Sequence, residues 1–263
     1  MNGKGTRIKL RDLTIGYSSK KTENIVAKSI FADICGGELT GLFGANGVGK
    51  STLLRTLSAF QPSLSGDIII QGKTLKEYTE KELSLMIGLV LTEKIDGRNM
   101  SVRELVSLGR SPHTGFWGNL SSEDCRIVEE AIYLVKIDNL ADRQIYTLSD
   151  GERQKVMIAK ALAQQTPIIL LDEPTAFLDF QSKVEILRLL HQLSKEADKT
   201  IFLSTHDVEL FLQIADKIWL MDKEHGIRIG SPDELATDGT LSAFFSHKDI
   251  QFDAANKSFR VRF

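Results

Sequence analysis

The sequence is poor in cysteine and in long apolar runs, and each shortage excludes a class of protein. Its 263 residues include two cysteines, Cys35 and Cys125, which lie far apart without the spacing of a metal site. This favours a reduced cytosolic setting over a disulfide framework. No apolar run approaches the roughly 18 residues of a membrane-spanning helix, and the amino terminus MNGKGTRIKLRDL has no apolar signal-peptide region. We therefore expect that the chain does not enter a membrane by itself.

An excess of charge of one sign is also missing. The net charge is −2, so there is no electrostatic argument for nucleic acid as a partner. Apolar residues make up 42% and charged residues 26% of the chain, which is the balance of a soluble protein with a sizeable core. The length allows one large domain, or one domain that carries a subdomain.

Apolar patterning divides the chain into three regions. In the first third, short apolar runs and glycine-containing turns predict mainly strands. The pattern becomes helical from about Ser101, and strands alternate with helices again after Pro167. Such alternation predicts a mostly parallel sheet covered by helices. The expected strands are 6–17, 26–34, 38–43, 67–71, 86–91, 168–172, 200–205 and 217–222, and the expected helices are 49–60, 101–110, 121–136, 184–193 and 208–215, with a further helix after LSDGE.

The fold class that follows is α/β, with an antiparallel β subdomain at the N-terminus. The helical block at about residues 95–165 is expected to be a subdomain inserted into the core. The last residues, IQFDAANKSFRVRF, predict a short hairpin around Asn256 and Lys257.

Residues 44–51, GANGVGKS, match the phosphate-binding pattern G-x-x-x-x-G-K-[ST] between an expected strand and an expected helix. Glycines let backbone N–H groups converge on phosphate oxygens, and the helix N-terminus favours negative charge. Lys50 is expected to reach the β- and γ-phosphates, and the Ser51 hydroxyl to bind Mg²⁺. The core is therefore expected to be a P-loop NTPase core that binds ATP. The expected ATP contacts are Gly44, Ala45, Asn46, Gly47, Val48, Gly49, Lys50, Ser51 and Thr52.

Two adjacent carboxylates follow the apolar run Ile168–Leu171. Asp172 at the end of a buried strand could bind the magnesium ion, and Glu173 could act as general base toward a water molecule. His206, in LSTHD, ends another expected strand at the same edge of the sheet, where ligands of α/β folds bind. It could contact the γ-phosphate or orient Glu173.

The stretch 148–152, LSDGE, reads locally as a capping box, with Ser149 at the N-cap and Glu152 three residues later. Together with the P-loop, ILLDE and STHD, in this order and spacing, it resembles the ATPase subunit of ABC transporters. In that family the stretch corresponds to the signature LSGGQ, and the likeness covers nearly the whole chain.

The resemblance implies a dimer of ATPase subunits in which the P-loop of one chain faces the signature of the other. Ser149 and Gly151 would then contact the partner's ATP, while the acids Asp150 and Glu152 point away from its γ-phosphate. We expect Ser149 to cap its own helix in the free chain and to turn to the phosphate on dimer closure. The family also implies that Tyr17 stacks on adenine and that Asp179 is a dimer contact.

Two features depart from the family. Within the signature, Asp150 stands where glycine is usual and Glu152 where glutamine is usual. The other departure is at residue 93. A glutamine that reaches Mg²⁺ is usual after the strand that precedes the helical subdomain, whereas Glu93 occupies that place here. A carboxylate can still bind Mg²⁺, so Glu93 is a candidate contact for both ATP and the metal. The resemblance assigns residues 1–232 to the ATP-binding domain and residues 233–263 to a C-terminal extension of it.

The segment 101–120 and the following LSSED most resemble the subfamily that serves iron–siderophore, haem and cobalamin importers. The expected protein is thus a peripheral ATPase at the cytoplasmic face of the plasma membrane. It would act with a separate integral membrane permease and indirectly with a substrate-binding protein. A soluble ABC-type ATPase acting in DNA repair, translation or cofactor assembly is the main alternative. It would usually show a coiled-coil insertion, a second cassette or a basic surface. A small-molecule P-loop kinase would have no need of LSDGE.

Overall fold

The computed structural model describes residues 5–19, 22–91, 100–115, 117–246 and 250–261. The strands are β1 (Thr6–Ser18), β2 (Glu23–Cys35), β3 (Leu39–Phe43), β4 (Ser65–Ile70), β5 (Lys73–Thr74), β6 (Ile87–Val90), β7 (Ile168–Asp172), β8 (Thr200–Ser204), β9 (Lys217–Asp222), β10 (Gly226–Gly230), β11 (Ile250–Asp253) and β12 (Ser258–Val261). The α-helices are α1 (Lys50–Leu57), α2 (Glu80–Met86), α3 (Val102–Ser107), α4 (Ser122–Leu134), α5 (Asp150–Ala163), α6 (Phe180–Glu196), α7 (Val208–Leu212), α8 (Pro232–Thr237) and α9 (Thr240–Phe245).

A six-stranded sheet in the order β10-β9-β3-β8-β7-β6 forms the centre of the molecule. Its five strands from β9 to β6 run parallel, and β10 pairs antiparallel with β9 at the edge. Every residue of β3, β7 and β8 is buried, as expected for parallel strands that are covered on both faces. The mostly parallel sheet predicted from the sequence is therefore confirmed.

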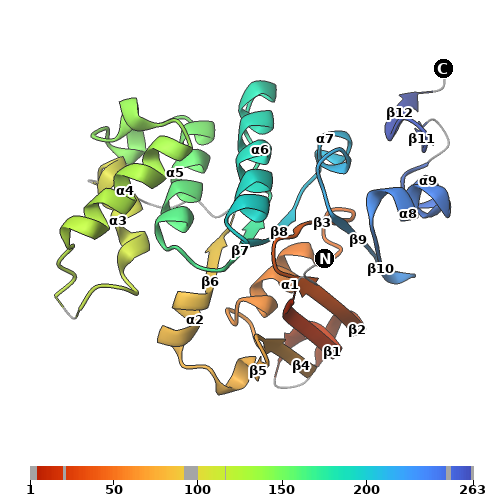
Figure 1. Cartoon of the computed structure of the whole chain (residues 1–263). Helices are drawn as coiled ribbons and strands as arrows, with labels where there is room; N and C mark the ends of the chain where they lie inside the picture. Colours follow the sequence, from red (N-terminus) through yellow and green to blue (C-terminus); the bar gives the residue numbers. More distant parts are fainter. Residues whose placement is uncertain (1–4, 20–21, 92–99, 116, 247–249, 262–263) are drawn as a thin grey trace.

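The two faces of this sheet carry separate apolar cores, because successive side chains of a strand point to opposite sides. On β7, Ile169 and Leu171 pack into one core with α5 and α6, whereas Ile168 and Leu170 pack into the other with α1 and β1. Figure 1 shows α6 and α7 on one side of the sheet and α1 on the other. Helix α1 is therefore held between two sheets.

The second sheet has the order β2-β1-β4-β5 and is antiparallel throughout. It confirms the antiparallel β subdomain that was predicted at the N-terminus. Its apolar face packs on α1 through Ile8, Leu10 and Ile15. This packing brings the end of β1 next to the start of α1, where the phosphate-binding pattern lies.

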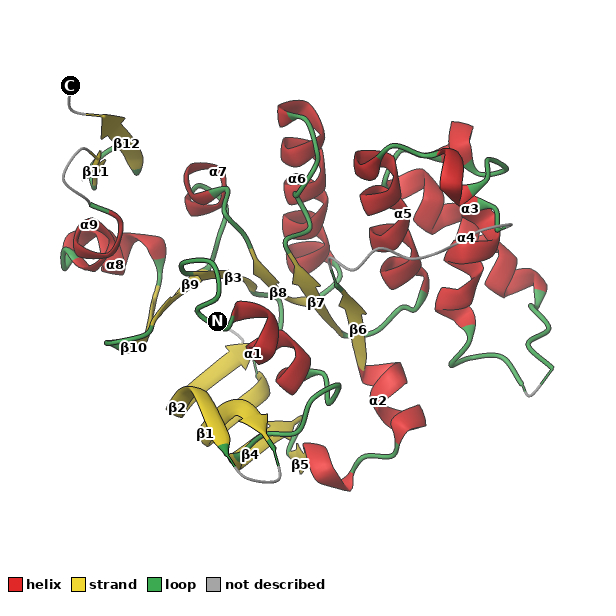
Figure 2. Cartoon of the chain, turned by 180° about the vertical axis from the view of Figure 1, so that it is seen from behind, coloured by secondary structure: helices red, strands yellow, loops and turns green. Residues whose placement is uncertain are grey.

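The helices α3, α4 and α5 lie between β6 and β7 in the chain and pack on one another at one end of the molecule. At the opposite end, α8, α9 and the hairpin β11–β12 follow β10 (Figure 2). The ring of Phe245 meets Phe43 edge to face at a centroid distance of 6.1 Å, and Phe252 and Phe259 pack on Phe245. These rings anchor the C-terminal segment beside the end of β3.

Several expected boundaries differ from those observed. The helix expected at 49–60 ends at Leu57, because Ala59 adopts a left-handed backbone with φ 62°. The helix expected at 208–215 ends at Leu212.

Other elements were not predicted from the sequence because each is short: helix α2, strand β10 and the helices α8 and α9. The hairpin around Asn256 and Lys257 is confirmed. The domain boundaries at about 95–165 and at 232 stay predictions. Within the described ranges, no helix is long and apolar enough to cross a bilayer.

Candidate nucleotide site

The loop between β3 and α1 has, at two positions, a backbone conformation that favours glycine. Gly47 has φ 72° and Gly49 has φ 117°, both in the region that disfavours other residues. A Cβ atom on Gly49 would also lie 2.0 Å from Cγ1 of Val26, whereas one on Gly47 would meet nothing within 4 Å. The pattern therefore folds into a tight loop that leads directly into the N-terminus of α1.

Lys50, the first residue of α1, is 94% shielded from solvent. Its Nζ donates to the carbonyl oxygen of Gly44 at 2.9 Å and lies 3.5 Å from Nε2 of His206. Burial lowers the pKa of the lysine, while the carboxylates Glu173 and Asp172 raise it and so partly offset that effect. The ammonium is thus folded over its own loop, close to two acids and an imidazole.

The two carboxylates stand where β7 ends. Asp172 is the last residue of β7 and pairs in register with Ser204, the last residue of β8. The Ser204 hydroxyl donates to Oδ1 of Asp172 at 2.6 Å, and the backbone N–H of Glu173 donates to the Ser204 hydroxyl at 2.9 Å. Glu173 turns away from the strand with φ 49°. Such a conformation in a non-glycine residue is strained and is typical of functional sites.

His206 follows β8 and reaches the same point. Its Nε2 lies 2.8 Å from Oε1 of Glu173. A carboxylate can take a proton from a water molecule, and an imidazole at this distance fixes the orientation of the carboxylate. The adjacent strands β7 and β8 therefore bring together an acid–imidazole pair beside the buried ammonium of Lys50.

Tyr17 lies near the end of β1, beside the helix that follows the loop. Its hydroxyl is 2.9 Å from the hydroxyl of Thr52 in α1, while about half of the side chain remains exposed. The hydrogen bond fixes the tyrosine next to the phosphate-binding loop and leaves ring surface free. An aromatic ring so placed can stack on a nucleobase.

The residues present fit a magnesium ion. Asp172 is a nearly fully buried carboxylate, and Ser51 lies in α1, which packs on β7. A carboxylate and a hydroxyl are oxygen ligands of the kind that Mg²⁺ prefers. Among the described residues, no three His, Cys, Asp or Glu side chains gather to hold a metal. The ion would therefore need further oxygen ligands from a bound phosphate.

The stretch LSDGE forms the predicted capping box at the start of α5. The Ser149 hydroxyl accepts from the N–H of Glu152, and the Glu152 carboxylate accepts from the N–H and the hydroxyl of Ser149 at 2.8 and 2.9 Å. The bond from this N–H is the main reason why the pKa of Glu152 is lowered. Asp150 pairs with Arg153 at 3.0 Å. Both acids are thus turned back toward their own helix.

Asp179 caps α6, and its Oδ1 accepts from the N–H of Ser182 at 2.7 Å. The preceding residues pass close to the signature stretch, because a Cβ on Gly151 would lie 3.0 Å from the carbonyl oxygen of Phe177. Side chains of Phe177 and Phe180 on either side of Asp179 are exposed. Signature and Asp179 therefore form a second group within the chain.

The structure thus sorts the predicted site residues into two groups. One group gathers around the start of α1 and consists of residues 44–52, Tyr17, Asp172, Glu173 and His206. The other lies around the starts of α5 and α6 and consists of Ser149, Gly151 and Asp179. Figures 1 and 2 both show α5 well apart from α1. Glu93 lies outside the described residues.

Sequence reasoning missed Ser204, which bonds to both Asp172 and Glu173. The available signal was its place two residues before His206, at the end of the strand that pairs with β7. A serine at a strand end is common, and only the register with Asp172 shows its role.

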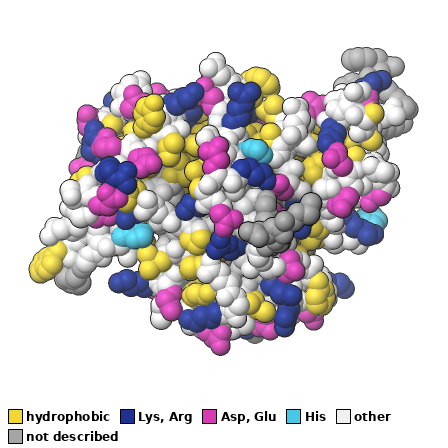
Figure 3. Space-filling model, in the orientation of Figure 1, with side chains coloured by type: hydrophobic (Ala, Val, Ile, Leu, Met, Phe, Trp, Pro, Cys, Tyr) yellow, Lys and Arg dark blue, Asp and Glu magenta, His cyan; other side chains and the backbone are white. Residues whose placement is uncertain are grey.

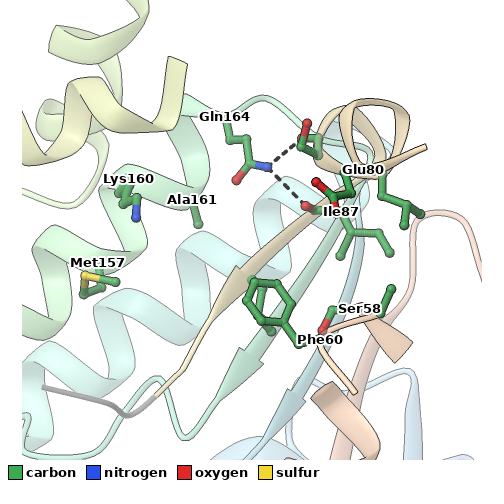
Figure 4. A pocket seen from close by; sticks show the side chains of 12 residues that line it. Ser58, Phe60, Glu80, Ile87, Met157, Lys160, Ala161 and Gln164 are labelled. Carbon is green, nitrogen blue, oxygen red and sulfur yellow. Dashed lines mark hydrogen bonds between the residues drawn. The ribbon is translucent and has the colours of Figure 1, made fainter. Parts of the chain in front are cut away.

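A groove runs between the end of α1, α2, β6 and α5 (Figure 4). Its apolar lining includes Leu83, Ile87 and Met157, and the Gln164 amide closes one end by donating to the carbonyl oxygens of Ser84 and Ile87 at 2.6 and 3.1 Å. Lys160 also lines the groove, and burial lowers its pKa without a charged partner among the described residues. The groove therefore combines apolar surface with the carboxylate of Glu80 and the ammonium of Lys160.

The sequence matches the ABC transporter family over residues 28–176, more than half of the chain. A curated relative is the ferric enterobactin transport ATP-binding protein of Escherichia coli (strain K12). It is 35% identical over 247 residues, a stretch that covers 94% of this chain and 90% of the relative.

Solved structures agree with this likeness. A metal-chelate type ABC transporter in an inward-facing conformation matches at 26% identity and a TM-score of 0.77, over 98% of this chain and 96% of the other. A dimeric ATP-binding cassette with ADP and phosphate matches at 27% identity and a TM-score of 0.75, over 85% of this chain and 98% of the other. The chain therefore belongs to the ABC transporter family, as one of its nucleotide-binding, ATP-hydrolysing subunits.

Proposed function

We propose that the chain energises an importer for an iron–siderophore, haem or cobalamin and hydrolyses ATP in a nucleotide-sandwich homodimer. The contact between Glu173 and His206 beside Lys50 carries the catalytic part of the proposal. The substrate class is supported by the relative named for ferric enterobactin transport and by the structure named for a metal-chelate transporter.

In the proposed reaction, backbone N–H groups of residues 44–49 bind the phosphates, and Lys50 leaves the Gly44 carbonyl to bind the β- and γ-phosphates. Glu173 takes a proton from the attacking water, whose oxygen bonds to the γ-phosphorus while the bond from that phosphorus to the β–γ bridging oxygen breaks and ADP leaves. His206 holds the Glu173 carboxylate in place. Ser51 and Asp172, with Glu93 as a further candidate, would hold a magnesium ion, which when bound would offset negative charge on the phosphates. Tyr17 stacks on the adenine.

The signature completes the site from the partner subunit. In the dimer, the Ser149 hydroxyl leaves Glu152 and donates to the γ-phosphate of the partner's ATP, beside the backbone N–H of Gly151. The acids Asp150 and Glu152 stay turned toward their own helix, away from that phosphate. Asp179 contacts the partner subunit near the same point.

The groove of Figure 4 is the proposed docking site for a separate integral membrane permease, and a substrate-binding protein would act through that permease. An apolar segment with an acidic side chain would fit its lining, because such a side chain could pair with Lys160. The subunit would thus lie on the cytoplasmic face of the plasma membrane as a peripheral protein.

A soluble ABC-type ATPase that acts in DNA repair, translation or cofactor assembly is the second candidate. The net charge of −2 gives it no support. Nucleic-acid binding would require a surface area rich in basic side chains. On the face in Figure 3, acidic and basic side chains are instead interspersed.

Copurification from detergent-solubilised membranes tests the proposal. We expect a multi-span protein to copurify with the wild-type chain, and with the control Tyr133→Ser, which removes an exposed aromatic ring on α4 outside the groove. Phe60→Ser removes an equally exposed ring that lines the groove and should reduce copurification while leaving basal ATP hydrolysis unchanged. Recovery with ribosomes or DNA alone would refute the transport function.

A further inference from the structure

Asp207, next to His206, binds two other segments through its carboxylate. Its Oδ1 accepts from Nζ of Lys183 at 2.6 Å, and its Oδ2 accepts from the hydroxyl of Thr175 at 2.5 Å. Its backbone N–H donates to the Thr205 hydroxyl at 3.0 Å. Both carboxylate oxygens and the backbone N–H of Asp207 thus have hydrogen-bond partners.

Each of the three segments joined in this way carries a residue of the proposed function, namely Glu173, His206 or Asp179. Thr175 lies in the loop after β7, two residues beyond Glu173, and Lys183 lies in the first turn of α6, after Asp179. Asp207 itself lies in the loop after β8, immediately after His206. One carboxylate therefore connects the loop of Glu173, the loop of His206 and the start of α6.

The ion pair is well shielded, since the side chains of Lys183 and Asp207 are 27% and 21% exposed. A shielded pair with a further hydrogen bond holds its geometry better than an exposed pair, and removal of one partner leaves the other charge poorly solvated. The pair is thus suited to fix the position of the loop of His206.

We propose that Asp207 is a positioning residue that holds His206 against Glu173 and, through Lys183, makes the start of α6 move together with His206. This inference rests on the proposed function, because it assumes that Glu173 and His206 carry out hydrolysis. Without Asp207, the loop after β8 would lose its bonds to Thr175 and Lys183 and keep those of Ser204 at the strand end. The 2.8 Å contact between Nε2 of His206 and Oε1 of Glu173 would then be held less firmly. The backbone of the phosphate-binding loop should keep its position, because the hydrogen bonds of Asp207 in the described part of the chain go to Thr175, Lys183 and Thr205.

The test is steady-state ATP hydrolysis by full-length Asp207→Asn, Lys183→Met and the double variant. We expect kcat to fall by about 10- to 100-fold in Asp207→Asn, since a misplacement of about 1 Å in a catalytic group can cost about 10²-fold. The KM for ATP, and ATP affinity from equilibrium titration, should change by less than about twofold, because the phosphate contacts remain. The double variant should be no worse than Asp207→Asn, since both changes remove the same link.

Lys195→Met is the matched control. Lys195 pairs with Asp216 at the other end of α6, far along the helix from His206, so its loss should leave kcat unchanged. An equal fall in kcat in the control, or a rise in KM without a fall in kcat, would overturn the positioning role. If Asp207→Asn does not fold, Lys183→Met, which keeps most of the aliphatic part of the lysine side chain, tests the same link through its kcat and KM. If the wild-type chain itself hydrolyses no ATP, the proposed function fails instead.

Discussion

Nε2 of His206 lies 2.8 Å from Oε1 of Glu173, although 32 positions of sequence separate the two residues. The parallel pairing of β7 and β8 brings them together, because both residues follow the carboxyl ends of adjacent strands. The strained backbone of Glu173, with φ 49°, directs its side chain toward this point.

Replacement of Glu173 by glutamine should remove hydrolysis and leave ATP binding intact. The amide keeps the size of the side chain but cannot take a proton, so we expect turnover to fall by about 10²- to 10⁴-fold. Size-exclusion chromatography with ATP should then show an accumulated dimer. Glu196→Gln, on the exposed surface of α6, should behave as wild type, and full turnover by Glu173→Gln would remove Glu173 as the base.

Replacement of Gly49 by alanine should abolish nucleotide binding. The new methyl group would lie 2.0 Å from Val26, and φ at this position is 117°. Gly47→Ala is the matched control, since its φ of 72° carries strain of about 1–2 kcal/mol but its methyl group meets nothing within 4 Å. Titration with a fluorescent nucleotide measures both. Equal affinities in the two variants would contradict the role of close packing at Gly49.

Two substitutions of Ser149 separate its role as a helix cap from its proposed role as a ligand of the partner's phosphate. Ser149→Ala should destabilise the chain by about 1 kcal/mol through loss of the cap and should also impair hydrolysis. Ser149→Asp in a Glu152→Gln background keeps a capping acceptor without a second carboxylate beside it, so its free energy of unfolding should stay near that of Glu152→Gln alone. It places a negative charge where the partner's γ-phosphate would bind, so ATP-driven dimerisation should fail.

Unfolding and dimerisation assays on the same preparations distinguish these effects. Normal ATP hydrolysis by Ser149→Ala would show that the hydroxyl serves only the helix. Normal dimerisation of Ser149→Asp in the Glu152→Gln background would show that the phosphate does not approach this residue.

The pair of Arg110 and Asp124 should make stability depend on pH. Bonds from the hydroxyl and the N–H of Ser121, together with Arg110 Nε at 2.8 Å, lower the pKa of Asp124 to about 2. Because this value lies below the ordinary 3.8, the pair stabilises the fold above pH 3.8, and the contribution is lost as the pH falls toward about 2.

Asp124→Asn should therefore lower the free energy of unfolding near neutral pH, and its difference from the wild type should shrink as the pH falls. Urea unfolding between about pH 7 and about pH 3 measures this trend. Glu123→Gln, whose pair with Arg126 is exposed, should show a smaller effect. A difference that does not change with pH would contradict the role of the charge.

The sequence alone predicted the sheet, the phosphate-binding loop and the capping box, because each depends on local patterns. The run Ile168–Asp172 reads as a buried strand without knowledge of its neighbours, and Ser149 with Glu152 identifies a helix start. His206 could be placed at the correct edge of the sheet, since parallel strands end together.

The remaining features depend on contacts between distant segments. No local pattern shows that Ser204 bonds to Asp172, that Asp207 binds Lys183, or that Val26 closes on Gly49. Strand β10 and the helices α8 and α9 were missed because they have few periodic positions, and α9 is held by the packing of Phe245 on Phe43.

The capping box at Ser149 has a consequence for how ATP is conserved. In the single chain the Ser149 hydroxyl donates to the carboxylate of its own Glu152. In the proposed dimer this hydroxyl serves the ATP of the partner subunit. One subunit alone would therefore hold only part of a complete ATP site. Hydrolysis by free subunits would then rise with the square of their concentration and be slow when they are dilute. Two subunits bound to one permease would meet at an effective concentration near the millimolar range. ATP would therefore be hydrolysed mainly where transport takes place.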